Sequence, residues 1–142
     1  MPGSAVEPAR LIGRPIVRGT VHHVSEPASN DCLFCKIVSG AVPATVVRRT
    51  DRVVAFRDID PKAPTHILVI PTAHLATAVE VAAHDPALLG ELVMVAGDLA
   101  AEDGIAGSGY RLVLNTGKDG GQTVFHAHIH LLGGRPMSWP PG

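Results

Sequence analysis

The sequence predicts one α+β domain built on a mostly antiparallel five-stranded sheet. Five strand-like runs are linked by turn signals of the kind that join β-hairpins, and one long amphipathic helix separates the third run from the fourth. The 142 residues, 46% of them hydrophobic, are enough for one ordinary domain with a real core. Besides the long helix, we expect one short helix at the start of the domain.

The short helix is predicted over Leu33–Ser39. Asn30 or Asp31 would cap it, because a side-chain oxygen at that position accepts a hydrogen bond from a free backbone N–H of the first turn. Gly40 would end it. Three strands are then expected at residues 45–49, Val53–Arg57 and residues 66–70.

The long helix is predicted over residues 86–103. Asp85 can cap it, Pro86 fits its first turn, and Gly104 fits the position just past its end. Apolar residues recur on one face at helical spacing, namely Leu88, Leu92, Val95 and Leu99. The last two strands are expected at residues 110–115 and 124–132, joined by a glycine-rich loop at residues 116–122.

Residues 1–30 form an N-terminal extension, and the domain proper spans residues 31–142. The extension is rich in Pro and Gly and has weak periodicity. A short strand at residues 11–17, packing on the domain and packing on a partner chain are open alternatives for it.

Composition excludes several classes of function. The formal net charge is −1 with no long basic run, so we expect no nucleic-acid partner and no anionic membrane partner. No segment has the apolar length of a membrane span, and residues 1–10 lack the apolar core of a signal peptide. The expected location is the cytoplasm.

Three histidines in strict alternation are the most informative feature of the chain: His126, His128 and His130. In a strand, alternate side chains point to one face, so the three imidazoles would line one surface. On a helix, His128 would point away from the other two. The apolar, partly β-branched neighbours favour the strand. Three groups that titrate near neutral pH would suit phosphate binding and nucleophilic chemistry.

The glycine-rich loop leads straight into these histidines. Its glycines allow backbone N–H groups to converge on an anion, and Asn115 and Thr123 add neutral donors. Taken alone, such a loop is more often a simple hairpin connection. A three-histidine metal site is the main rival reading of the triad, and the residues alone leave that choice open.

Cys32 and Cys35 are the only cysteines and lie too close together to staple a fold. A Cys-x-x-Cys pair is ambiguous between zinc binding, redox chemistry and chance. A thioredoxin-like site needs a βαβ context, which the sequence does not indicate.

The chain resembles the histidine triad (HIT) superfamily, and within it the Hint branch of purine nucleoside phosphoramidases. The resemblance runs from about Leu33 to the C-terminus. It is carried by motifs along the domain: Phe56-Arg57-Asp58-Ile59, Ala63-Pro64-Thr65-His66-Ile67-Leu68-Val69-Ile70-Pro71, Asp119-Gly120-Gly121-Gln122-Thr123-Val124, His126-Ala127-His128-Ile129-His130-Leu131-Leu132, Leu132-Gly133-Gly134-Arg135-Pro136-Met137 and Trp139-Pro140-Pro141-Gly142. The last of these is especially characteristic of Hint.

The resemblance implies roles for the polar residues. His128 would be the nucleophile that attacks the α-phosphorus of a nucleoside 5′-phosphoramidate and forms a nucleotidyl-histidine intermediate. His130 would bind the phosphate oxygens, and His66 would support the charge and tautomer of His128. The other residues implied in the catalytic or phosphate site are His126, Asn115, Gln122 and Thr123, where relatives often have Ser in place of Thr123.

The same resemblance implies a nucleoside site and a HIT-like homodimer. Asp58 would accept hydrogen bonds from the ribose hydroxyls, and Trp139 would shape leaving-group specificity across the dimer interface. An apolar purine pocket would be formed by Phe34, Ile37, Val42 and Phe56, although spacing alone favours plain core packing for these four. The partners implied are purine nucleoside monophosphates and phosphoramidates.

Many bacterial histidine triad proteins hold a structural zinc, and the resemblance extends to its ligands. The matching residues here are Cys32, Cys35, His74 and His126, a sound tetrahedral Cys₂His₂ set. Zinc on His126 would occupy its lone pair, so that residue would not be the nucleophile. The hydrolytic chemistry itself would need no cofactor.

Two other functions compete with phosphoramidate hydrolysis. One is dinucleoside polyphosphate hydrolysis, as in the Fhit-like branch, which the Gly-Gly-Arg motif and the Trp-Pro-Pro-Gly ending disfavour. The other is a non-catalytic purine nucleotide-binding module, which the intact triad together with His66 disfavours.

Overall fold

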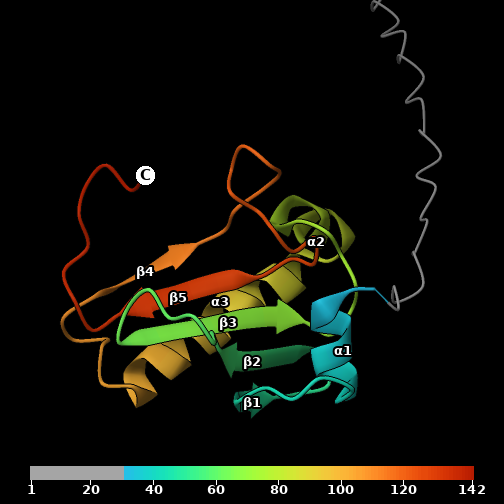
Figure 1. Ribbon diagram of the computed structural model, residues 1–142, viewed down its shortest axis with the longest axis horizontal. Helices are drawn as coiled ribbons and strands as arrows, with labels where there is room; N and C mark the ends of the chain where they lie inside the picture. Colours follow the sequence, from blue (N-terminus) through green and yellow to red (C-terminus); the bar gives the residue numbers. More distant parts are fainter. Residues whose placement is uncertain (1–30) are drawn as a thin grey trace, which may run out of the picture.

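A computed structural model describes residues 31–142 of the chain. The expectations for the extension at residues 1–30 fall outside the described residues. The described part has three helices and five strands (Figure 1): α1 (Leu33–Ser39), β1 (Val46–Arg49), β2 (Val53–Arg57), β3 (Thr65–Pro71), α2 (Ala78–His84), α3 (Pro86–Glu102), β4 (Tyr110–Val113) and β5 (Ile129–Gly133).

The predicted α+β class and five-stranded antiparallel sheet are confirmed. The strand order is β1-β2-β3-β5-β4, and each neighbouring pair is antiparallel. Strands β3 and β5 are adjacent, with His66 opposite Leu132 and Leu68 opposite His130. This register brings the first histidine of the site beside the last one, although 64 residues separate them in the sequence.

The sheet buries a different cluster on each face, because side chains alternate along every strand. Helix α3 crosses one face (Figure 1), and its buried residues pack there against Val53, Ile67 and Leu131. On the other face, the short α1 packs through Phe34 and Ile37 against Phe56 and neighbouring apolar residues. Helix α1 covers only one end of this face. The other end of the face carries polar side chains.

The helix ends largely follow the predicted signals. Helix α1 has the predicted bounds, and Gly40 ends it with φ +82°. Its cap, however, is Cys32 rather than Asn30 or Asp31: the Sγ atom accepts a hydrogen bond from Cys35 N–H at 3.4 Å. Helix α3 begins as predicted, because Asp85 accepts a bond from Ala87 N–H at 3.0 Å.

The short helix α2 was not among the predicted elements. Thr77 caps it by accepting a bond from Glu80 N–H at 3.2 Å, and the Glu80 carboxylate accepts from Ala76 N–H at 2.8 Å. A Thr-x-x-Glu pair before an apolar run is a capping-box signal. The sequence therefore contained a cue for this helix.

The last strand is shorter than predicted. Strand β5 begins at Ile129, so His126 and His128 precede the strand and only His130 lies on it. The segment before β5 is held by other bonds, of which Ala127 N–H to Leu75 O at 2.6 Å is one. It therefore does not pair with β3 in the sheet.

Within residues 31–142, no helix combines the length and apolar character needed to cross a bilayer.

Candidate active site

A cavity of about 260 Å³ opens on the polar end of the sheet face that carries α1. Four residues that the sequence analysis assigned to the site line it together: Asp58, His66, Asn115 and His130. The other lining residues are Asp60, Lys62, Val113 and Leu132. The segment after β2, strands β3 and β5 and the loop after β4 therefore bring these side chains to a single opening.

The hydrogen bonds of His66 assign its tautomer. The backbone N–H of Lys62 donates to His66 Nδ1 at 3.0 Å, and an N–H group can only donate. Neutral His66 therefore carries its proton on Nε2, which lies 2.9 Å from His130 Nδ1. Nδ1 of His130 accepts the hydrogen bond from this Nε2–H, so neutral His130 carries its own proton on Nε2. The expected support from His66 thus passes to His130, while His128 has a different partner.

His128 is held by the backbone of its own segment. Its Nδ1 lies 2.7 Å from the carbonyl oxygen of His126, which can only accept, so Nδ1 carries the proton and Nε2 has the free lone pair. The ring is 9% exposed. Among the contacts of the described residues, no hydrogen bond engages Nε2, so its lone pair is free.

Neighbouring rings fix the plane of the His128 imidazole. The Phe34 ring meets it edge-on with centroids 5.1 Å apart, and the His130 ring lies at 4.9 Å. The middle histidine therefore stays beside its companions, as expected. The strand that was predicted to carry it begins only at Ile129, the residue after it.

Burial keeps the histidines of the site neutral at physiological pH. Burial is the largest cause that lowers the pKa of His128 and of His66, each against a smaller opposing effect of the Asp58 carboxylate. Burial, with the neighbouring His128 and His66, lowers the pKa of His130 to about 4. A neutral imidazole with a free lone pair is the form that acts as a nucleophile.

Asp58, His66 and His130 also have the composition of a metal site, with one ligand atom each within 4.8 Å of the others. The hydrogen bonds argue against that use. Because Lys62 N–H occupies Nδ1 of His66, the Nε2 atom that faces His130 bears a proton and has no lone pair for a metal. This group is therefore a hydrogen-bonded relay.

The second group of possible metal ligands is Cys32, Cys35, His74 and His126, the set that the sequence analysis assigned to zinc. Cys35 Sγ lies 3.2 Å from His74 Nδ1 and 3.6 Å from His126 Nδ1, and Cys32 Sγ lies 3.5 Å from His126 Nδ1. In a tetrahedral zinc site, sulfur and nitrogen ligands are about 3.6 Å apart, given bond lengths of about 2.3 and 2.0–2.1 Å.

The protonation of His126 also fits a metal ligand. Its Nε2 lies 2.8 Å from the carbonyl oxygen of Pro71, so Nε2 carries the proton and the lone pair of Nδ1 faces the two sulfurs. Burial lowers the pKa of this ring to about 4, which keeps it neutral. A carbonyl that holds the second nitrogen of a ligand histidine is a common feature of metal sites.

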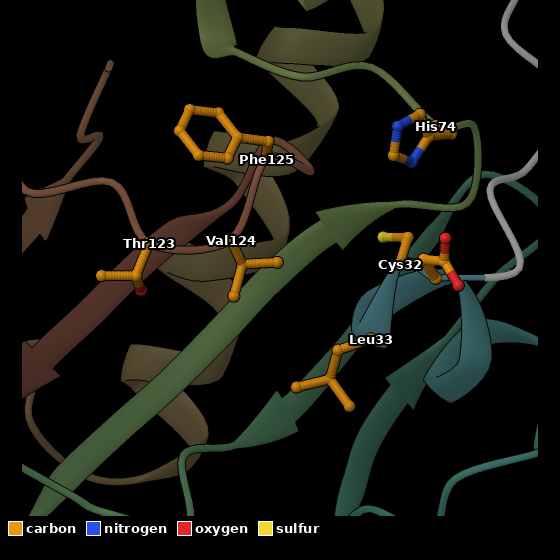
Figure 2. Close-up of a pocket in the computed structure, with 7 residues that line it drawn as sticks. Cys32, Leu33, His74, Thr123, Val124 and Phe125 are labelled. Atoms are coloured by element: carbon orange, nitrogen blue, oxygen red, sulfur yellow. The ribbon is translucent and has the colours of Figure 1, made fainter. Parts of the chain in front are cut away.

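Thr123 lines a different cavity, of about 420 Å³, together with Cys32, His74 and Phe125. Figure 2 shows Cys32 and His74 on one side of this pocket and Thr123, Val124 and Phe125 on the other. The structure thus brings Thr123 next to the possible metal ligands and not into the lining of the cavity that holds Asp58 and His130.

Gln122 has its side chain engaged within the loop. Its Oε1 accepts from Gly117 N–H at 2.9 Å, and its Nε2 donates to the carbonyls of Ala76 at 2.7 Å and Val124 at 3.1 Å. These bonds hold the glycine-rich loop in place, and direct substrate contact by Gln122 stays a prediction. Gly120 is also sterically required, because a Cβ there would lie 2.5 Å from Thr116 O.

The four residues assigned to a purine pocket share one cluster. Phe34, Ile37 and Phe56 are almost fully buried there, and Val42 packs against them partly exposed. Core packing accounts for these contacts, so purine binding by the four stays a prediction. Trp139, in contrast, is 83% exposed.

Comparison with known proteins places this geometry in a family. The family model described as "HIT domain" matches residues 39–137. The chain belongs to the HIT domain family. It is 47% identical over 109 residues to the purine nucleoside phosphoramidase of Escherichia coli, which covers 77% of this chain and 92% of that protein. It is 51% identical over 114 residues to a HIT-like protein of Synechococcus elongatus, covering 80% and 99% of the two chains.

Solved structures of the HIT family have the same fold. The HIT family hydrolase from Legionella pneumophila matches with a TM-score of 0.76 and 53% identity, covering 79% of this chain and all of the other. The HIT family hydrolase from Clostridium thermocellum matches with a TM-score of 0.74 and 43% identity, covering 77% and 95% of the two chains.

Two residues of the HIT site were missed by the sequence analysis. Lys62 acts through its backbone N–H, which every residue except proline possesses, so no side-chain pattern could reveal it. Arg135 donates from its guanidinium to the carbonyl of Lys62. The Gly-Gly-Arg motif was the only cue, and it served only to mark the family.

Proposed function

We propose that this HIT domain is a nucleotide hydrolase that cleaves purine nucleoside 5′-phosphoramidates to the nucleoside 5′-monophosphate and an amine. The proposal depends above all on one observation. The Nδ1–H of His128 is held by the carbonyl of His126, so the free lone pair is on Nε2.

In the first step, His128 Nε2 attacks the α-phosphorus, and the P–N bond breaks. The leaving nitrogen takes the electron pair of that bond, gains a proton from solvent and departs as the amine. The imidazole becomes positively charged when it bonds to phosphorus, and the carbonyl of His126 stabilises the charge through Nδ1–H. Covalent catalysis of this kind replaces one difficult displacement by two easier steps.

In the second step, water attacks the same phosphorus and breaks its bond to Nε2, which releases the monophosphate and restores neutral His128. His130 presents Nε2–H in both steps, since His66 occupies its Nδ1. That donor would stabilise the negative charge that builds on the phosphoryl oxygens. Asn115 and Asp58, which line the same cavity, are proposed to contact the phosphate and the ribose hydroxyls.

Thr123 is proposed to act on the leaving-group side. It lines the 420 Å³ cavity, whereas Asp58 lines the 260 Å³ cavity where we place the ribose. A hydroxyl there can donate to the departing nitrogen or to a phosphoryl oxygen.

We further propose that Cys32, Cys35, His74 and His126 hold a structural zinc ion. The Cys₂His₂ composition, the spacing of the ligand atoms and the neutral state of His126 support this. Zinc would tie the first turn of α1 to the segment that carries His128. It would take no part in the chemical steps.

We also expect the protein to act as a homodimer, with Trp139 of each chain near the site of the other. Its exposed indole, on the segment after β5, is available for such a contact.

The intermediate is the sharpest test of the function. Enzyme that turns over adenosine 5′-phosphoramidate is quenched in base, because the P–N bond of a nucleotidyl-histidine is labile in acid, and is analysed by intact mass and by peptide mapping. We expect a nucleotidyl adduct on His128, and we expect His128→Ala to lower kcat/KM by at least about 10³-fold with the fold retained. His84→Gln, at the end of α2 and outside both cavities, is the matched control and should keep full activity.

Three results would contradict the proposal. The first is substantial turnover by His128→Ala. The second is preferential cleavage of dinucleoside polyphosphates, which would indicate the Fhit-like reaction. The third is saturable binding of adenosine monophosphate with no turnover of any phosphoramidate, which would indicate a binding module.

A further inference from the structure

The segment that leaves β5 passes close to the loop between β2 and β3 at one end of the sheet (Figure 1). Gly134 makes the approach with φ +86°, a left-handed conformation that glycine adopts without steric cost. A Cβ on this residue would lie 2.9 Å from Cβ of Pro64, so only glycine allows the two backbones to come this close. The next residue, Arg135, therefore reaches the loop.

The guanidinium of Arg135 donates two hydrogen bonds to one carbonyl of that loop. Its Nε and Nη2 atoms donate to Lys62 O at 3.1 and 2.8 Å, and its Nη1 donates to Pro136 O at 3.1 Å. The same Lys62 presents its N–H to His66 Nδ1 at 3.0 Å. An exposed guanidinium is thus connected to His130 by three successive contacts, through Lys62 and His66.

We propose that Arg135 is a positioning residue for the histidine relay: by fixing Lys62, it selects the Nε2–H tautomer of His66 and, through it, that of His130. If the loop were free to move, the Lys62 N–H would no longer keep Nδ1 of His66 unprotonated, and only the Asp58 carboxylate, 3.5 Å from Nε2, would still favour the Nε2–H tautomer. His130 would then lose its donor at Nδ1 in part of the molecules, and its Nε2 would lack the proton that we assign to the phosphoryl oxygen.

The effect of Arg135 on the tautomers is argued from these contacts, whereas the effect of Arg135 on turnover rests on the proposed function. His128 should not respond, because a backbone carbonyl of its own segment holds its Nδ1–H. This difference between His130 and His128 separates a specific positioning role from general destabilisation.

The test compares ¹⁵N-labelled histidine spectra of the wild type and Arg135→Gln, with metal content and folding verified for each. We expect Nε2–H for His66 and His130 in the wild type, a mixture of tautomers for both in the variant, and an unchanged Nδ1–H for His128. Arg111→Gln is the matched control. Arg111 also donates to a carbonyl of the C-terminal segment, Ser138 O at 2.9 Å, but no described contact links it to the loop.

Turnover provides the second readout. We expect Arg135→Gln to lower kcat about ten-fold, a part of the ~10²–10³-fold that one hydrogen-bond donor to the developing negative charge supplies, and Arg111→Gln to leave it unchanged. Arg135→Lys keeps a cation that can donate to Lys62 O, so it should recover part of kcat and of the wild-type tautomers.

Wild-type tautomers for His66 and His130 in Arg135→Gln would overturn the proposal, even if turnover fell. If Arg135→Gln does not fold, the comparison is made with Arg135→Met, which keeps the apolar stem and removes every donor to Lys62 O, and wild-type tautomers in that variant count against the proposal in the same way. If the wild type does not cleave phosphoramidates, the proposed function fails, but the spectra still decide the role of Arg135.

Discussion

At the scale of single residues, the site is organised by the choice of ring nitrogen that carries each proton. His66 and His130 keep theirs on Nε2 because partners occupy Nδ1, and His128 keeps its proton on Nδ1 because a carbonyl accepts it. His126 has its proton on Nε2 and turns its lone pair to the sulfurs. Four chemically identical side chains thus have different roles, and backbone groups set three of the four assignments.

The low pKa of His130 predicts a loss of stability in acid. In the unfolded chain the ring has its ordinary pKa of about 6.5, whereas burial lowers the pKa to about 4 in the folded chain. Between these values the unfolded state binds more protons, so the free energy of unfolding must fall as the pH is lowered from about 6.5 to about 4. Above pH 6.5 this contribution is constant.

His130→Asn removes this group and should reduce the pH dependence by at most about 1.4 kcal/mol per pH unit. The measurement is urea unfolding of both proteins at several pH values between 7 and 4.5. Acid protonates the proposed zinc ligands in both proteins alike, so the difference between the two pH dependences reports His130. Parallel curves for the two proteins would show that the ring is not held neutral.

At the scale of elements, the short helix α1 connects the possible metal site to His128, the proposed nucleophile. Cys32 caps it and Cys35 lies in its first turn, and Phe34 between them packs edge-on against both His126 and His128. A seven-residue helix has little stability of its own, so its position depends on tertiary contacts. Ligation at its first turn would supply the strongest of them.

Removal of the metal should therefore loosen α1 more than the sheet. We expect Cys35→Ser to lose stoichiometric zinc, to speed hydrogen exchange of the α1 amides and to lower kcat, because the edge of Phe34 no longer restrains the His128 ring. The amides of β2 and β3, buried in the sheet centre, are the internal reference. Purified wild-type protein with no bound metal and an equally protected α1 would contradict the zinc proposal.

At the scale of the whole molecule, the chain has one closed face and one functional face. Helix α3 covers the first (Figure 1), and a bidentate ion pair from Arg57 to Asp103 at 2.9 Å attaches its C-terminal end to β2. This pair and Thr65 hold the pKa of the Asp103 carboxyl below its usual range. Trp139, on the segment after β5, is exposed, and β4 is an edge strand of the described sheet. An unpaired edge and an exposed indole are both suited to contact with a second copy.

A mixed-dimer experiment can show whether Trp139 serves the partner's site. His128→Ala lacks the nucleophile, and we expect Trp139→Ala to keep hydrolysis with altered amine selectivity. If Trp139 acts across the interface, dimers mixed from the two variants contain one site with an intact His128 and an intact Trp139. Mixing in equal amounts should then restore wild-type amine selectivity at about half of the active sites. A monomer in solution, or mixing with no effect on selectivity, would show that Trp139 does not act in this way.

Much of the fold could be predicted because its signals are local. Asp85, Pro86 and the apolar stripe of α3 lie in one short stretch, and Val53–Arg57 has the bounds that its composition predicts. Local reasoning failed where distant partners decide. The strand expected from residue 124 begins at Ile129, because bonds to residues 75 and 76 hold the preceding segment away from the sheet.

By itself, the sequence determined the fold class and the set of side chains available for chemistry, because the hydrophobic period and the spacing of the histidines are properties of consecutive residues. Only the tertiary structure decided what each histidine can do. The tautomer of an imidazole depends on which donor or acceptor lies within hydrogen-bond distance of each nitrogen. For His66 and His130 these partners meet only when β3, β5 and the loop before β3 are packed together.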